Sequence, residues 1–183
     1  GMKKRYPDVF FSQFTGAELV ADKWNLTRED LDKFALESHQ KAANATELKY
    51  FDREILPVKG KNVEGIDDLV LSDEGIRFDA SLDKLSGLKP VSEGGKITAG
   101  NASQITDGAA AVVICNEVGL KKIQSNPRAE IISISVVGDD PVLMLTGPIP
   151  ASKKALKNAQ LNIDDIDIYE VNEAFAPVPL AWA

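Results

Sequence analysis

The sequence predicts an α/β protein with a mostly parallel or mixed sheet. An apolar stripe at helical spacing runs through residues 27–45. Short apolar or alternating runs occupy residues 109–115, 131–137 and 166–171, and segments with helical spacing separate them. Such an alternation of strands and helices is typical of crossover units, which place their strands in one sheet.

The helix predicted over residues 27–45 has the clearest pattern. Thr27, followed three residues later by Asp30, is a signature of a helix N-terminus. Further helices are expected over 17–24, 117–123 and 151–160, and Ser81 is expected to cap a short one. The stripe that should face the core of the protein consists of Leu31, Phe34, Ala35, Ser38 and Ala42.

The three predicted strands differ in pattern. Residues 109–115 are continuously apolar, as in a strand that is buried on both faces, so Cys115 at the end of this run should be an inert thiol in the core. Residues 131–137 are rich in β-branched side chains, and residues 166–171 alternate. Residues 57–74 contain several turn formers and predict surface loops with at most short strands.

Composition narrows the classes of function. The chain has 183 residues, of which 44% are apolar, and this predicts a globular protein. Its net charge of -7 argues against nucleic-acid binding. We expect no membrane segment and no signal peptide, because no apolar run is long enough, and the cytoplasm is therefore the expected location. Gly1 before Met2 is expected to be left over from a cleaved tag.

Two motifs carry most of the functional information. Asn172-Glu173-Ala174-Phe175-Ala176 follows the last predicted strand, and Gly100-Asn101-Ala102-Ser103 lies about seventy residues earlier. Taken alone, the first would most often be a helix N-cap and the second a tight turn packed beneath the next strand. Taken together and in this order, they resemble the central portion of a thiolase. Pro177 and Pro179 should then limit or interrupt the helix that follows.

The resemblance covers nearly the whole chain and implies a partial thiolase-like fold. Residues 3–89 resemble the helical loop domain over the coenzyme A site. Residues 90–126 resemble the end of the N-terminal domain, and residues 127–183 the start of the C-terminal domain. Each of the latter two would supply a piece of one mixed-sheet half, and apolar sheet edges left exposed in this way should favour a homo-oligomer.

The resemblance also implies a set of site residues. Asn172 matches the residue that holds a water of the oxyanion hole, and Ala174 and Phe175 match residues that border the pantetheine tunnel. Ser103 and Ala99 match positions along the pantetheine path of coenzyme A. Arg77 matches a residue that packs on the nucleotide end, where a guanidinium can stack on adenine and attract phosphate.

The catalytic set of the family is not matched. Thiolases use two cysteines and a histidine, whereas this chain has one of each, Cys115 and His39, and neither lies in a matching motif. We expect His39, on the flank of the helical stripe, to be a partly buried, hydrogen-bonded structural residue. Ser12 and Gln13 stand where many thiolases have residues beside the acyl pocket, which leaves acyl specificity undefined.

These observations predict a thiolase-family acyltransferase segment that is inactive on its own. Coenzyme A or an acyl-CoA would be its substrate, with weak binding at best and no permanently bound cofactor. Three alternatives stay open at this point. The chain could be a noncatalytic module that binds coenzyme A or mediates interactions, the functionless remnant of a truncated gene, or one piece of a split thiolase.

Overall fold

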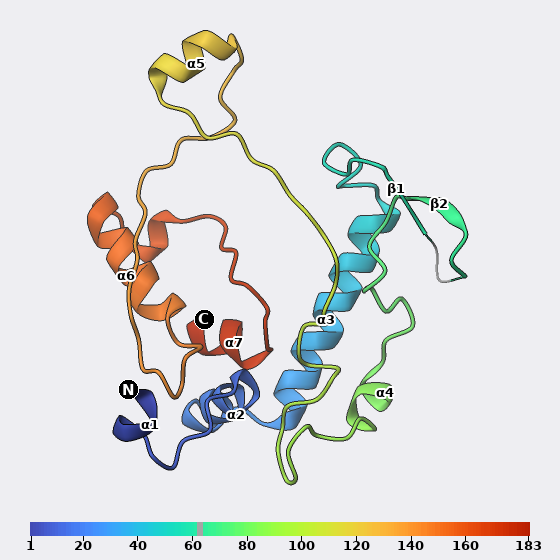
Figure 1. Ribbon diagram of the computed structural model, residues 1–183, viewed down its shortest axis with the longest axis vertical. Coiled ribbons are helices and arrows are strands. Elements are labelled where there is room, and N and C mark those ends of the chain that lie inside the picture. Colours follow the sequence, from blue (N-terminus) through green and yellow to red (C-terminus); the bar gives the residue numbers. More distant parts are fainter. Residues whose placement is uncertain (62–63) are drawn as a thin grey trace.

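The computed structural model describes residues 1–61 and 64–183. In Figure 1, α2, α7 and one end of α3 lie together, while α5 lies at the far end of two long coil segments. The elements follow one another as α1 (Met2–Arg5), α2 (Gln13–Lys23), α3 (Arg28–Glu47), β1 (Val58–Lys61), β2 (Asp67–Val70), α4 (Leu82–Ser86), α5 (Glu117–Ile123), α6 (Pro148–Ala159), the 3-10 turn η1 (Ile163–Asp165) and α7 (Pro177–Trp182).

Helix α3 confirms the helix predicted from the apolar stripe. Its N-terminus is held by a reciprocal capping box between Thr27 and Asp30. The Asp30 backbone amide donates to Thr27 Oγ1 at 3.2 Å, and the Thr27 backbone amide donates to Asp30 Oδ2 at 2.8 Å. Hydrogen bonds from the Thr27 side chain and backbone lower the pKa of the Asp30 carboxyl. The motif satisfies amides that the first turn of any helix leaves unpaired.

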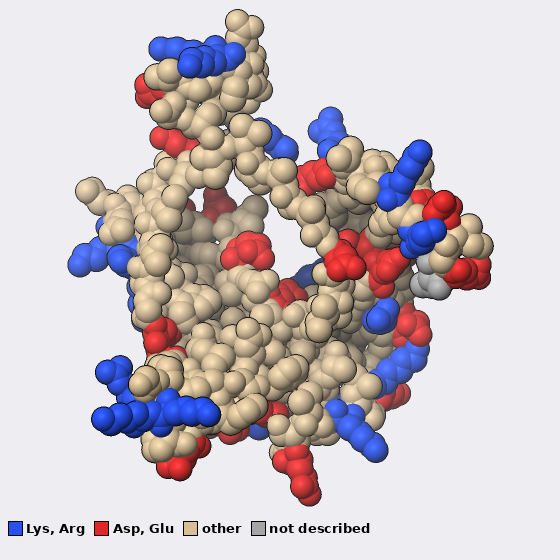
Figure 2. All heavy atoms as spheres, viewed as in Figure 1, with Lys and Arg blue, Asp and Glu red and all other residues tan. Residues whose placement is uncertain are grey.

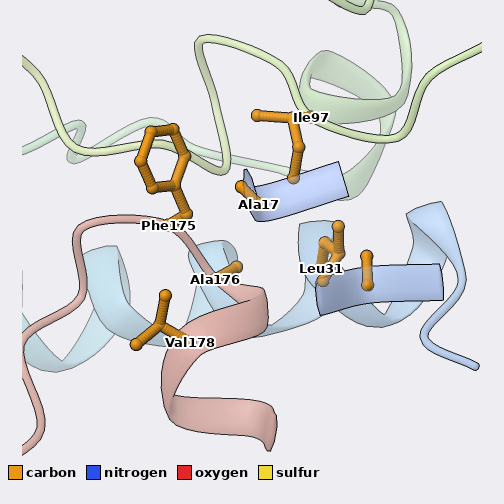
Figure 3. Packing of buried hydrophobic residues seen from close by; sticks show 7 residues of the cluster. Ala17, Leu31, Ile97, Phe175, Ala176 and Val178 are labelled. Atoms are coloured by element: carbon orange, nitrogen blue, oxygen red, sulfur yellow. The ribbon is translucent and has the colours of Figure 1, made fainter. Parts of the chain in front are cut away.

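The core lies where α2, α3 and α7 meet. Leu31 of α3 and Ile97 of the coil after α4 are fully buried, and Phe175, just before α7, packs in the same cluster. Figure 3 shows these side chains between the helices. The ring of Phe175 meets that of Phe14 edge to face, with centroids 5.3 Å apart. The core therefore joins the first helices of the chain to its last segment.

The short helices α4 and α5 and the strands β1 and β2 agree with the predictions from the sequence. Ser81 caps α4 by accepting a hydrogen bond from the Lys84 amide, and α5 spans the predicted residues 117–123. Strands β1 and β2 pair antiparallel within the segment where we expected loops with at most short strands. Helix α6 begins at Pro148, three residues earlier than predicted, because proline is well suited to the first turn of a helix.

The prediction for the helix after Asn172 was wrong. Helix α7 begins at Pro177 and continues to Trp182, so the prolines start the helix and do not interrupt it. Both prolines lie in the first turn, where a backbone amide has no partner within the helix and its absence costs nothing.

The predicted buried strands are not formed within the described residues. Residues 109–115, 131–137 and 166–171 belong to no sheet, and most of them are exposed. The prediction that Cys115 is a core thiol was likewise wrong, because its side chain is exposed. A strand becomes buried only when other strands pair with its edges and other elements cover its faces.

Residues 131–137 nevertheless keep the alternation of a strand. Ser133, Ser135 and Val137 are half-buried, and Ser135 Oγ donates to the Ala151 carbonyl of α6 at 2.7 Å. The opposite face carries only apolar side chains, and it is bare: the exposed fractions are 64% for Ile132, 73% for Ile134 and 80% for Val136. One face of this segment thus lies toward α6, while its apolar face is uncovered.

Candidate functional site

The two motifs singled out in the sequence meet in the structure. Ala102 and Phe175 form an antiparallel β-bridge. The Ser103 amide donates to the Ala174 carbonyl at 2.9 Å, and the Ala176 amide donates to the Asn101 carbonyl, also at 2.9 Å. These backbone bonds fix the two motifs edge to edge, so their side chains can act on one ligand.

A cleft of about 860 Å³ opens beside this junction. Figure 2 shows an opening in the middle of the face, with acidic side chains near its edge. Helix α3 forms one wall with Phe34, Ser38 and His39. The other walls are formed by residues 72–76, 100–108 and 172–173.

The predicted site residues take different places around this cleft. Ser103 and Asn172 are exposed and line it. Arg77 and Ala99 are exposed but are not among the described residues that line the cleft, and Ala174 is half-buried beside it. Phe175 is only 5% exposed and packs in the core. The structure thus brings Ser103 and Asn172 together, and contacts of all these residues with coenzyme A stay predictions.

Because Gly100 has no side chain, Leu85 and Leu88 can pack closely against the turn. A Cβ atom added at Gly100 would lie 2.6 Å from methyl carbons of both Leu85 and Leu88. Such a distance is far below van der Waals contact, so alanine at this position would force at least the side chains of Leu85 and Leu88 to move. This supports the reading of the turn as a tightly packed element.

His39 links the helix wall to the segment around Arg77. The Arg77 backbone amide donates to His39 Nδ1 at 3.3 Å, and the imidazole is half-buried, which confirms the predicted partial burial and hydrogen bonding. Burial and, to a smaller degree, the charge of Arg77 lower the pKa of His39, while the nearby Glu173 carboxylate acts in the opposite direction. Glu173 itself accepts a hydrogen bond from Ser38 Oγ at 2.6 Å.

The charged residues in the lining of the cleft are mainly acidic. Its carboxylates are Asp73, Glu74, Asp107 and Glu173, and among the described lining residues Lys61 is the one lysine or arginine. A phosphate group inside would meet repulsion from these carboxylates, whereas a neutral chain with amide groups would not. The cleft therefore suits the uncharged part of a ligand.

Sequence reasoning missed a buried polar network beneath the turn. Asn101 Nδ2 donates to Asp32 Oδ1 and to the Lys96 carbonyl, each at 3.0 Å, and Asn101 Oδ1 accepts from the Thr98 amide at 2.8 Å. Arg28 Nε donates to Asp32 Oδ2 at 2.7 Å. The available signal was an acidic residue, Asp32, directly beside the apolar stripe of α3, four residues after an arginine.

In residues 1–61 and 64–183, no three His, Cys, Asp or Glu side chains are grouped so that they could hold a metal ion. Across the same residues, no helix is long and apolar enough to cross a membrane.

Comparison with known proteins identifies the family. Residues 4–118 match the model of the thiolase N-terminal domain, and residues 125–183 match that of the thiolase C-terminal domain. The chain belongs to the thiolase family. It is 48% identical over 178 residues to the steroid 3-ketoacyl-CoA thiolase FadA6 of Mycobacterium tuberculosis, covering 97% of this chain and 42% of that protein. It is 44% identical over 162 residues to the 3-ketoacyl-CoA thiolase of Aliivibrio fischeri, with coverage of 87% and 42%.

Solved structures confirm the partial thiolase-like α/β fold. The acetyl-CoA acetyltransferase of Bacillus anthracis superposes with a TM-score of 0.89 at 38% identity, covering 96% of this chain and 45% of that one. Human mitochondrial 3-ketoacyl-CoA thiolase gives a TM-score of 0.86 at 42% identity, with coverage of 92% and 42%. This thiolase-family chain thus spans less than half the length of the relatives that it matches.

Proposed function

We propose that this chain supplies the coenzyme A-facing part of a thiolase-type acyltransferase. The observation that carries the proposal is the junction of the two motifs, which places Ser103 and Asn172 on one cleft. These residues match positions that hold the pantetheine arm and an oxyanion-hole water in the family. The side chain of Asn172 is exposed, and an amide can both orient a water molecule and donate a hydrogen bond toward a developing negative charge.

The charges around the cleft favour one orientation of a bound coenzyme A. Its acidic lining favours the neutral pantetheine arm and disfavours phosphate groups. Arg77 lies at the edge, since its backbone contacts His39 of the cleft wall. We therefore place the nucleotide end of coenzyme A on the Arg77 side and the thioester end toward Asn172.

Acyl transfer itself needs groups that this surface does not provide. The reaction requires a thiolate nucleophile and groups that move protons. Cys115 is not among the described residues that line the cleft, and His39 is held by the Arg77 amide. We infer that the isolated chain binds a coenzyme A thioester without turning it over.

Titration with coenzyme A, followed by amide NMR shifts and calorimetry, tests this function. We expect saturable shifts at Ser103 and Asn172, with a Kd on the order of 0.1–1 mM, because an open cleft returns little of the free energy lost on association. Arg77→Ala should weaken binding, and more so at low salt, whereas Arg128→Ala, at another exposed arginine, should not. No binding at millimolar coenzyme A would contradict the proposal and favour a chain without a present function.

A second candidate, one piece of a split thiolase, is favoured by the bare apolar segments. Residues 109–115 and the outer face of 131–137 expose side chains that strands of a complete sheet would cover. The test is to supply, as separate polypeptides, the parts of a related thiolase outside the matched region. Recovery of thiolysis would support the split enzyme, and a mixture without complex formation would count against it.

A further inference from the structure

The strongest feature that the proposed function leaves unused is the buried network of Arg28, Asp32 and Asn101. Asp32 and Asn101 are each only 3% exposed, although both are polar. Burying such groups is unfavourable unless every donor and acceptor has a partner. Here each of the four side-chain oxygen and nitrogen atoms of Asp32 and Asn101 makes at least one hydrogen bond.

Asn101 is the point where the network reaches the ligand-binding turn. Its side chain forms hydrogen bonds with Asp32 of α3 and with both ends of the 96–98 segment, namely the Lys96 carbonyl and the Thr98 amide. Its own carbonyl accepts the Ala176 amide, and two residues later Ser103 donates to Ala174. The side chain of Asn101 therefore orients the turn, while its backbone carbonyl holds the Asn172–Ala176 motif.

Arg28 extends the network to α4. Its Nε atom pairs with Asp32, and its Nη2 atom donates to the Leu85 carbonyl at 2.7 Å and to the Leu88 carbonyl at 3.0 Å. The guanidinium thus balances the buried carboxylate while it closes the end of α4. Arg28 binds Oδ2 of the Asp32 carboxylate, and Oδ1 is left to accept the hydrogen bond from Asn101.

We propose that Asp32 and Asn101 are positioning residues, which fix the 100–103 turn so that Ser103 and Asn172 face the same ligand arm. The inference rests on the proposed coenzyme A-facing function and deepens it. Asp32 does not line the cleft, and the side-chain oxygen and nitrogen of Asn101 are already bonded to protein groups, so both residues act through the backbone bonds of Ser103 and Ala176. The swap of the two side-chain chemistries provides a specific test, since an amide and a carboxylate can be exchanged at constant size.

The experiment compares Asp32→Asn, Asn101→Asp and the double exchange in the full chain. Asn101→Asp places two carboxylates in contact, and Asp32→Asn removes the charge that Arg28 balances. Either single change should raise the exchange rates of the Ser103 and Ala176 amides by about tenfold or more, relative to helix amides far from the network. The double exchange restores one amide and one carboxylate and should recover part of this protection.

Ligand fragments distinguish positioning from general support of the fold. The single variants should bind pantetheine at least about fivefold more weakly, and adenosine 3′,5′-bisphosphate as the wild type does, because only the turn has moved. Glu29→Gln is the matched control, since Glu29 forms an exposed ion pair with Lys33 on the same helix at the same spacing. It should change neither fragment's binding nor the exchange rates.

Each outcome decides one point. If both fragments weaken equally, if helix amides lose protection together with those of the turn, or if losses in the double variant are additive, the positioning role is refuted. If the single variants do not fold, folding of the double exchange with a protected Ser103 amide supports the coupling, and its failure to fold refutes it. If the single variants raise exchange at the turn amides selectively but the wild-type chain binds no pantetheine, the proposed function is refuted while the positioning of the turn is upheld.

Discussion

Ala102 and Phe175 pair as an antiparallel β-bridge, although each belongs to a different region of the thiolase family models. Ala102 lies in the region that matches the N-terminal domain and Phe175 in the region that matches the C-terminal domain. The bridge is short, but the aromatic ring of Phe175 anchors it in the core against Phe14. The candidate site of this chain is therefore formed at the joint between the two regions that match these family models.

The joint can be tested at Ser103. Ser103→Pro removes the amide that donates to the Ala174 carbonyl and should lower the free energy of unfolding by about 1–3 kcal/mol. Ser103→Ala keeps this amide and loses only an exposed hydroxyl, so it should leave stability unchanged and weaken coenzyme A binding alone. Urea denaturation and coenzyme A titration measure the two effects. Equal stability of both variants would show that the bridge contributes little.

Local features of this chain could be predicted from the sequence. The stripe around Leu31 and the Thr27–Asp30 pair predicted α3, because helix periodicity and capping depend on residues a few positions apart. The meeting of Ser103 and Asn172 at one cleft could not be derived from periodicity. The family resemblance suggested it, since it assigned Ser103 to the pantetheine path and Asn172 to an oxyanion-hole water of the same active site.

Neither the polar network nor the exposure of residues 109–115 could be predicted from neighbouring residues, for different reasons. The pairing of Asp32 with Asn101 joins distant parts of the chain, and a single acidic residue beside an apolar stripe does not name its partner. Residues 109–115 have the composition of a buried strand, but composition cannot show whether neighbouring strands are present to bury it. The prediction of a buried Cys115 failed for the same reason, because it depended on that strand.

His39 makes stability depend on pH in a definite direction. Burial and the charge of Arg77 lower its pKa in the folded state below the ordinary value of about 6.5, so the unfolded chain binds the proton more readily. The contribution of His39 is therefore present above pH 6.5 and is lost as pH falls through the lower folded-state pKa. Unfolding midpoints in urea should fall over this window.

A matched variant isolates this contribution. His39→Asn places an amide oxygen where Nδ1 accepts the Arg77 amide, but it does not titrate. We expect a flatter dependence of stability on pH below about 6.5 than in the wild type. Because the chain has one histidine, a single imidazole signal in NMR reports the folded-state pKa directly. A value at or above 6.5 would contradict the assignment.

Self-association should follow from the bare apolar segments. Val112 is 83% exposed in a run with the composition of a buried strand, and unpaired strands with apolar side chains can pair with another copy. We expect concentration-dependent oligomers in analytical ultracentrifugation, reduced by Val112→Lys. Phe10→Lys is the control, at an apolar residue of similar exposure, 82%, outside these segments. A monomer at all concentrations, or an equal effect of both changes, would refute the expectation.

Cys115 can report whether residues 109–115 are covered by another polypeptide. Its thiol is exposed and is the only one in the chain, so a disulfide reagent such as DTNB should label one equivalent under native conditions. Complementary thiolase segments that cover residues 109–115 should slow labelling by about tenfold or more, because the thiol would then lie in a sheet. Urea-unfolded chain gives the reference rate.

The same thiol also decides how the isolated chain should be classified. We expect no thiolysis of acetoacetyl-CoA by the purified chain, since Cys115 does not line the described cleft and no second cysteine exists in it. Cys115→Ser should leave coenzyme A binding unchanged, because an exposed side chain away from the lining contributes nothing to the ligand surface. Turnover that disappears in Cys115→Ser would assign the nucleophile to this residue and overturn the view of the chain as a binding surface without its catalytic thiol.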